Sequence, residues 1–207
     1  MRIVRRLIES PERSSKILIG GLFLALAWRL GADFAETQRP TDLLTVVGAA
    51  LVVILTCLRR STQSVDRRTS VRSVTAISML APLLISPGGT EGFISEGAAA
   101  ALLSVGLIIA LGDKMSLGRS FGVLPANRGV MERGLYKLVR HPIYLGYLIT
   151  HIAFLGAHPS GWNVTVLLAG DVALLVRALY EEETLGRDPQ YVRYCQNVRW
   201  RIIPGVC

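Results

Sequence analysis

Six apolar segments alternate along the chain with connections that are by turns rich and poor in cations, and this alternation constrains the fold most. Only 18% of the residues are charged, against about 25% in soluble domains. Most segments are somewhat shorter than the ~20 residues of a membrane-crossing helix, but they can recruit flanking residues. The pattern predicts an all-α, polytopic membrane bundle of about six spans. The segments are 17–30, 43–58, 71–85, 98–111, 143–157 and 164–180.

The cations indicate how these spans are oriented. Most Lys and Arg residues lie in the N-terminal, second, fourth and C-terminal connections, whereas 31–42 holds only Arg39, and 86–97 and 158–163 hold none. Cytoplasmic loops carry the excess of Lys and Arg. We therefore expect an integral, multi-pass protein, in a bacterial inner membrane, with both termini and the 112–141 connection in the cytoplasm. Cations spread in this way suit membrane lipids as partners and do not form a nucleic-acid patch.

The start of the chain has two interpretations. Cations, an apolar run and then Ala25, Leu26 and Ala27 are typical of a cleavable signal peptide. The basic region is long, however, and Arg29 follows almost at once. We expect a retained first span. Cleavage within 1–27 would leave the orientation of the later spans unchanged.

Residues 134–146 combine a glycine, cations, aromatics and a histidine at the start of an apolar helix. Pro142 suits the first turn of that helix, because the N–H that proline lacks would have no partner there. The residues before it then approach the helix at the cytoplasmic surface, where free backbone N–H groups favour anions and polar ligands. The side chains that follow along one helix face are Tyr144, Tyr147 or Leu148, and His151.

A second polar cluster closes the sixth segment, where three consecutive glutamates follow Arg177. Acidic groups near a helix C-terminus oppose the helix dipole. Arg177 and Glu181 are i, i+4 neighbours that can pair, which leaves Glu182 on a different face. The breaker-rich turn at 157–163 predicts that the last two helices form an antiparallel hairpin. The hairpin returns these carboxylates to the start of the fifth segment, so we expect one polar pocket at the cytoplasmic face.

Asp171 lies inside the sixth segment, where an ionisable side chain is costly and usually faces a partner or a cavity. It is either a neutral, protonated carboxyl in a helix contact or part of a substrate path, and both interpretations stay open. The three cysteines are scattered without metal-ligand spacing, so we expect no metal site.

An RHPxYxG motif occupies 140–146, an EExxL motif occupies 181–185, and Tyr191 and Tyr194 follow at a spacing of three. In this order the motifs resemble the isoprenylcysteine carboxyl methyltransferase family, which belongs to a wider group of membrane methyltransferases that includes phospholipid N-methyltransferases. The resemblance covers 117–204. The chain differs at 186–189, where the family usually has Phe-Gly, and this affects the shape of a C-terminal lid rather than the cofactor site.

The resemblance implies S-adenosylmethionine as the cofactor, bound at the cytoplasmic face without a Rossmann domain. Carboxylates suit its ammonium group and ribose hydroxyls, and aromatic rings suit its adenine and its sulfonium. By motif, the residues that would line the cofactor pocket are Tyr136, Arg140, His141, Pro142 and Tyr144, with Glu181 or Glu182 closing it.

The implied reaction is methyl transfer to a lipophilic acceptor: a prenylated thiol-carboxylate, a lipid amine or a small thiol. The candidate catalytic residues are Arg177, Glu182 and Arg140. A carboxylate acceptor needs a cation beside it, which Arg177 or Arg140 would supply. Within one integral membrane domain, 112–207 would be the catalytic part and 1–111 the N-terminal membrane helices. Two alternatives are an NADPH-dependent sterol-type membrane reductase and a non-catalytic membrane protein that retains the fold.

Overall fold

The computed structural model describes residues 11–58, 66, 68–87, 91–117 and 129–206. Within these residues the regular secondary structure is helical, apart from one isolated parallel bridge between Val139 and Trp200, which confirms the all-α prediction. The α-helices are α2 (Pro11–Thr37), α3 (Pro40–Leu58), α4 (Thr69–Leu80), α5 (Glu96–Leu117), α6 (Pro142–Ala157), α7 (Gly161–Leu185) and α8 (Pro189–Asn197). Two 3₁₀ turns are η1 (Ala81–Leu84) and η3 (Gly134–Lys137).

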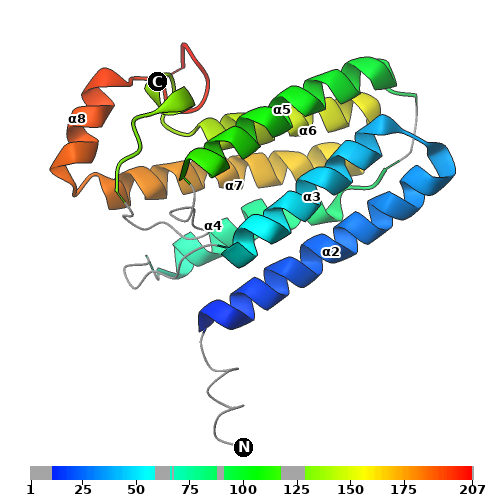
Figure 1. The fold of residues 1–207 in the computed structure, drawn as a ribbon, viewed down its shortest axis with the longest axis horizontal. Helices are drawn as coiled ribbons and strands as arrows, with labels where there is room; N and C mark the ends of the chain where they lie inside the picture. The colour runs from blue at the N-terminus through cyan, green and yellow to red at the C-terminus, as the bar shows by residue number, and fades with distance from the viewer. Residues whose placement is uncertain (1–10, 59–65, 67, 88–90, 118–128, 207) are drawn as a thin grey trace, which may run out of the picture.

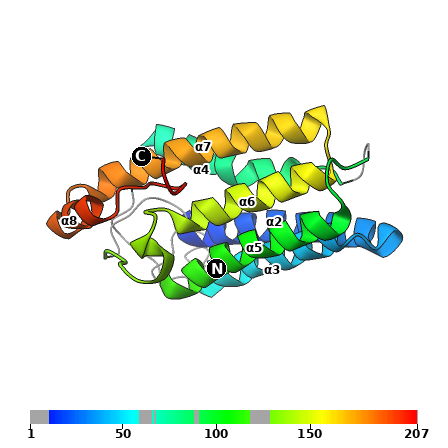
Figure 2. The same cartoon turned by 90° about the horizontal axis from the view of Figure 1, so that it is seen from above.

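Helices α2 to α7 form an elongated bundle (Figure 1), and the six apolar segments fall on them. α2 packs along α3, α5 along α6, and α4 along α7. Figure 2 shows α8 beyond the end of α7, while the turn between α6 and α7 lies at the opposite end of the bundle. α6 and α7 are antiparallel, as predicted. The predicted boundary between 111 and 112 falls inside α5, so the two predicted parts share this helix.

Pro82 ends the α-helical part of the third apolar segment. Proline has no N–H to donate and its ring clashes with the preceding turn, so the chain continues as the 3₁₀ turn η1. Arg29 of α2 and Trp162 of α7 donate hydrogen bonds to carbonyl groups of this turn. The side chain of Asn163 bonds to both the N–H and the carbonyl of Ser86, each at 2.9 Å. The break therefore ties the end of α4 to two other helices.

Glycines allow the closest helix contacts in the bundle. A Cβ added to Gly106 of α5 would meet the carbonyl oxygen of Gly146 in α6 at 2.7 Å. A Cβ added to Gly146 would meet the backbone nitrogen of Ala110 at 2.7 Å. Gly170 lets α7 approach Ala81 of η1 in the same way. Small residues at these positions let two backbones approach closely, as in membrane helix interfaces generally.

A buried polar cluster joins the helices at the end that holds the α6–α7 turn. The Thr41 hydroxyl donates to the Glu96 carboxylate at 2.9 Å and lies 3.2 Å from Nε2 of His158. Asp42 lies 3.5 Å from the same nitrogen. Burial lowers the pKa of His158, so its ring is uncharged at neutral pH. The cluster fixes the starts of α3 and α5 against the turn.

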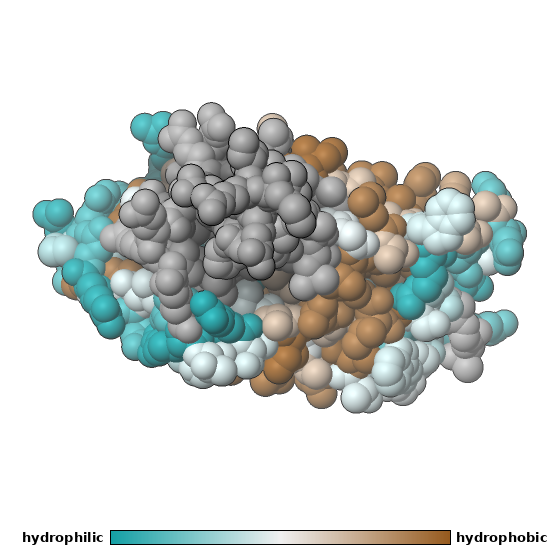
Figure 3. Space-filling view, turned by 90° about the horizontal axis from the view of Figure 1, so that it is seen from below, coloured by the Kyte–Doolittle hydropathy of each residue, from teal (hydrophilic) through white to brown (hydrophobic). Residues whose placement is uncertain are grey.

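The face of the bundle seen in Figure 3 has an apolar belt between more hydrophilic ends. Two of the described helices are long and apolar enough to cross a membrane by length and composition, over Glu96–Ser116 and Gly161–Leu185. Shorter apolar helices cover Pro40–Leu51, Thr69–Leu84 and Pro142–Ala157. Large apolar side chains exposed on α6 and α7 include Ile152, Leu168, Val172, Leu175 and Leu179.

The glycine contact between α5 and α6 predicts a difference between two alanine substitutions in one helix. Gly106→Ala should lower the free energy of unfolding, because overpacking costs about 1–3 kcal/mol. An added Cβ at Gly112 has nothing within 4 Å, so Gly112→Ala should raise stability by up to about 1 kcal/mol through helix propensity. Thermal unfolding of both variants in one detergent makes the comparison, and equal shifts would contradict the close contact.

Candidate functional site

The approach to α6 is held by the chain that follows α8. The N–H of Arg140 donates to the Trp200 carbonyl at 2.9 Å, and the N–H of His141 donates to the Arg201 carbonyl at 2.8 Å. Pro142 occupies the first turn of α6 with His141 at the N-cap, which confirms the predicted start of the helix. Backbone bonds from the C-terminal segment therefore position the RHPxYxG motif.

Glu182 gathers two guanidinium groups and an imidazole at the end of α7. Its carboxylate lies 3.3 Å from Nε2 of His141, 3.4 Å from Nη1 of Arg140 and 3.1 Å from Nε of Arg201. Arg140 also donates to two carbonyl groups at the end of α8, at 2.7 and 3.2 Å. Glu182 and Arg140 together connect the start of α6, the end of α7 and the segment after α8.

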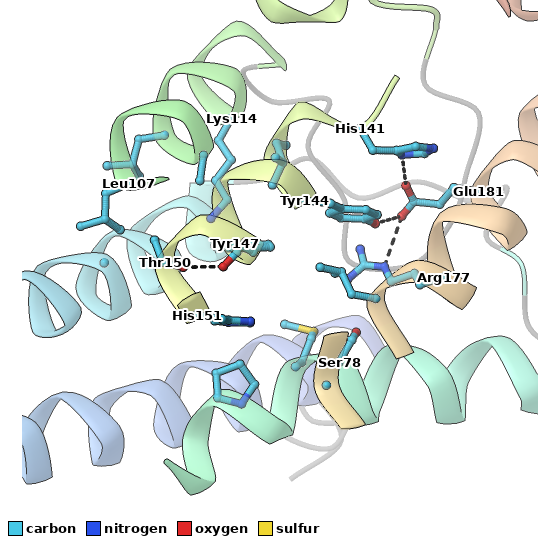
Figure 4. A pocket seen from close by; sticks show the side chains of 18 of the residues that line it. Ser78, Leu107, Lys114, His141, Tyr144, Tyr147, Thr150, His151, Arg177 and Glu181 are labelled. Atoms are coloured by element: carbon cyan, nitrogen blue, oxygen red, sulfur yellow. Dashed lines mark hydrogen bonds and ion pairs between the residues drawn. The ribbon is translucent and has the colours of Figure 1, made fainter. Parts of the chain in front are cut away.

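Glu181 points into the space between α6 and α7 (Figure 4). Its carboxylate accepts a hydrogen bond from the Tyr144 hydroxyl at 2.5 Å and one from Nε of Arg177 at 3.2 Å, which confirms the predicted i, i+4 pair. The His141 ring stacks on Tyr144 with ring centroids 5.3 Å apart. The Arg177 guanidinium lies 5.4 Å from the centroid of the same tyrosine ring. Charged, aromatic and hydroxyl groups thus meet at one point.

A cavity of about 280 Å³ continues from this cluster into the bundle. Side chains from α4, α5 and α6 point into its middle part (Figure 4), where Ser78, Lys114, Tyr147 and His151 line it. The far part is apolar and runs toward the α6–α7 turn. Its lining includes Phe23, Leu26, Leu103, Leu107, Phe154 and Leu167. One continuous space therefore has a polar end and an apolar end.

Three tyrosines complete the polar end. The Tyr194 hydroxyl donates to the Tyr136 carbonyl at 2.7 Å, which attaches α8 to η3. Tyr191 lines the cavity beside them. Burial raises the pKa of all three phenols well above its usual value, so the hydroxyl groups stay neutral.

Six of the eight site residues predicted from the sequence line the cavity, and two do not. Glu182 faces the cluster of Arg140, His141 and Arg201 instead, and Pro142 begins α6. The sequence left open whether Glu181 or Glu182 closes the pocket, and in the structure Glu181 lies in it. The lining residues are Tyr136, Arg140, His141, Tyr144, Arg177 and Glu181.

Lys114 is a cavity residue that the sequence assigned to a cytoplasmic connection. α5 continues beyond 111, so Lys114 remains on the helix, where it is 1% exposed. Its Nζ lies 4.9 Å from the centroid of the Tyr147 ring. Leu103, Leu107 and Ala110 line the cavity from the same helix face. Extending that spacing by one turn would have identified Lys114.

His151 and Asp171 form a pair between α6 and α7. Nδ1 of His151 lies 2.6 Å from Oδ1 of Asp171. The sequence indicated each residue separately but gave no helix register that would join them. The Asp171 carboxyl has a partner, as expected of an ionisable group at this depth.

Neither a protein-family model nor a curated protein matches this chain. Within the residues that the structure describes, no group of three or more His, Cys, Asp and Glu side chains is arranged to hold a metal ion. Fold and site define an all-helical bundle with an apolar belt and a cavity, lined by helices α2 to α8, that is polar at the α8 end.

Replacing Glu182 by glutamine should loosen α8 and the segment after it. A neutral amide loses its charge-assisted bonds to Arg140 and Arg201, each of which contributes about 1.5–3 kcal/mol. We expect hydrogen exchange of the α8 backbone amides to accelerate by at least about tenfold. Glu183→Gln is the matched control, because Glu183 pairs with the exposed Arg68, at 2.9 Å. Unchanged exchange in Glu182→Gln would show that Glu182 does not hold α8.

Proposed function

We propose that the protein is a membrane methyltransferase that uses S-adenosylmethionine to methylate a lipophilic acceptor, similar to the isoprenylcysteine carboxyl methyltransferases. One observation carries this proposal. The charged and aromatic residues of the two sequence motifs meet at one end of a cavity whose other end is apolar. A polar cofactor and an apolar acceptor could share such a space, end to end.

The chemistry of the lining side chains fits S-adenosylmethionine. Arg177 and Tyr144 hold the Glu181 carboxylate in place, where it suits an ammonium group or ribose hydroxyls. Arg140 lines the same end and suits the cofactor carboxylate. The rings of Tyr136 and Tyr144 suit adenine by stacking and a sulfonium by cation–π attraction. Bound there, the cofactor would supply an activated methyl group.

The apolar part of the cavity suits the acceptor. Burial of a lipid-like chain among Phe23, Leu26 and Phe154 would hold the reacting group near the polar end and exclude water from it. Arg177 lies where it could pair with an anionic acceptor. An acceptor from the bilayer could reach the cavity sideways between helices, because large apolar side chains are exposed on the outer faces of α6 and α7.

The apolar belt and the charge pattern support a multi-pass arrangement with the polar end of the cavity at the cytoplasmic face. The ends of α3, α5 and α7 lie at the α8 end of the bundle (Figures 1 and 2), and the cation-rich stretches that follow them in the sequence are 59–68, 118–141 and 186–207. The connections at the opposite end hold one cation, Arg39. This separation follows the positive-inside rule and would place both termini in the cytoplasm.

Calorimetry of the detergent-purified protein tests the proposal. S-adenosylhomocysteine should bind, and Glu181→Gln should weaken binding by at least about tenfold, because a charge-assisted bond is lost. The control is Glu183→Gln. Glu183 follows Glu181 by two residues on α7 and lies outside the cavity, so this variant should bind the ligand as the wild type does. Binding of NADPH instead would favour a reductase, and binding of neither ligand would favour a non-catalytic protein. Both outcomes would contradict the proposal.

A further inference from the structure

The His151–Asp171 pair lies deeper in the bundle than the polar end of the cavity. His151 follows Tyr144 by seven residues on α6, which is about 10 Å along a helix axis. Its ring lines the middle of the cavity (Figure 4), whereas Asp171 is not among the lining residues. The pair is largely enclosed, with side chains 14% and 20% exposed. Such a position is costly for ionisable groups and is retained where they serve a function.

The contact between the two side chains orients the imidazole. Nδ1 lies 2.6 Å from the Asp171 carboxylate, which accepts hydrogen bonds. In the neutral ring the one N–H group is then on Nδ1, and Nε2 keeps a free lone pair. Among the described residues Nε2 of His151 has no hydrogen-bond partner. The ring edge that His151 presents to the cavity is the basic one.

We propose that His151 is the general base for the methyl acceptor and that Asp171 is its positioning residue. This inference rests on the proposed function and narrows it: the acceptor reacts through the S–H group of a lipophilic thiol or the N–H group of a protonated lipophilic amine. Its proton passes to Nε2 while the freed electron pair takes the methyl group, and the electrons of the broken C–S⁺ bond remain on the departing thioether. The imidazolium so formed is stabilised by Asp171.

The same geometry disfavours a carboxylate acceptor at this position. A carboxylate is already a nucleophile and needs no base. A histidine base oriented by Asp171 would therefore serve no purpose for a carboxylate acceptor. The Asp171 carboxylate would also repel it. A thiol or an ammonium group, in contrast, must lose a proton before it can attack, and general-base assistance contributes typically about 10²–10⁴-fold.

The orientation of the imidazole can be tested without any ligand. In ¹⁵N NMR spectra of histidine-labelled protein at alkaline pH, His151 should show the tautomer protonated on Nδ1. An amide at position 171 donates to Nδ1 instead, so Asp171→Asn should convert the ring to the tautomer protonated on Nε2. A wild-type ring already protonated on Nε2 would overturn the proposal.

Methyl transfer from labelled S-adenosylmethionine to three probes tests the acceptor class: dodecanethiol, dodecylamine and dodecanoate. The thiol or the amine should be methylated, and Asp171→Asn and His151→Gln should each lower the rate by at least about hundredfold with unchanged binding of S-adenosylhomocysteine. Thr165→Val, on the exposed side of α7, is the control and should keep the wild-type rate. Unaffected rates in the variants, methylation of dodecanoate alone, or no methylation despite binding would overturn this inference. Absence of S-adenosylhomocysteine binding to the wild type would instead overturn the proposed function.

Discussion

The structure depends on which helices pair: α6 packs along α5 and α7 packs along α4, and α6 and α7 contact each other much less. Gly106 and Gly146 bring the backbones of α5 and α6 together, and Gly170 lets α7 approach η1. The two arms of the hairpin are thereby drawn to different partners. They meet at their turn and, through side chains, at the α8 end. The cavity includes the space that this pairing leaves between α6 and α7.

The adjacent residues Glu181 and Glu182 have different roles at the polar end of the cavity. Successive residues of an α-helix point about 100° apart, so Glu181 and Glu182 address different surroundings. Glu182 bonds to Arg140 and Arg201 and holds the segment after α8 in place. Glu181 is held by Tyr144 and lines the cavity. Of the two adjacent carboxylates, one therefore stabilises the fold and the other lines the cavity.

The sequence predicted the helices and the meeting of the two motifs, because apolar runs define helices and a short turn makes antiparallel neighbours. It did not predict which helices pair, since small residues occur in every span and their register is a tertiary property. For this reason the bond between His151 and Asp171 could not be foreseen. Lys114 was assigned to a loop because charge was used to end a helix that in fact continues. The N–H groups of Arg140 and His141 donate to backbone carbonyls of residues 200–201. Bonds between backbone groups leave no side-chain pattern in the sequence, so they could not be predicted from it.

Those backbone bonds also determine when the site can form. A chain grows at about 5–20 residues per second during synthesis. The segment that holds Arg140 and His141 is therefore made about 1–3 s after the end of α7, Leu185. Through this interval Glu182 lacks its Arg201 partner, and the approach to α6 lacks the backbone bonds that position it. The helices of the hairpin and the polar end of the cavity are thus completed at different times.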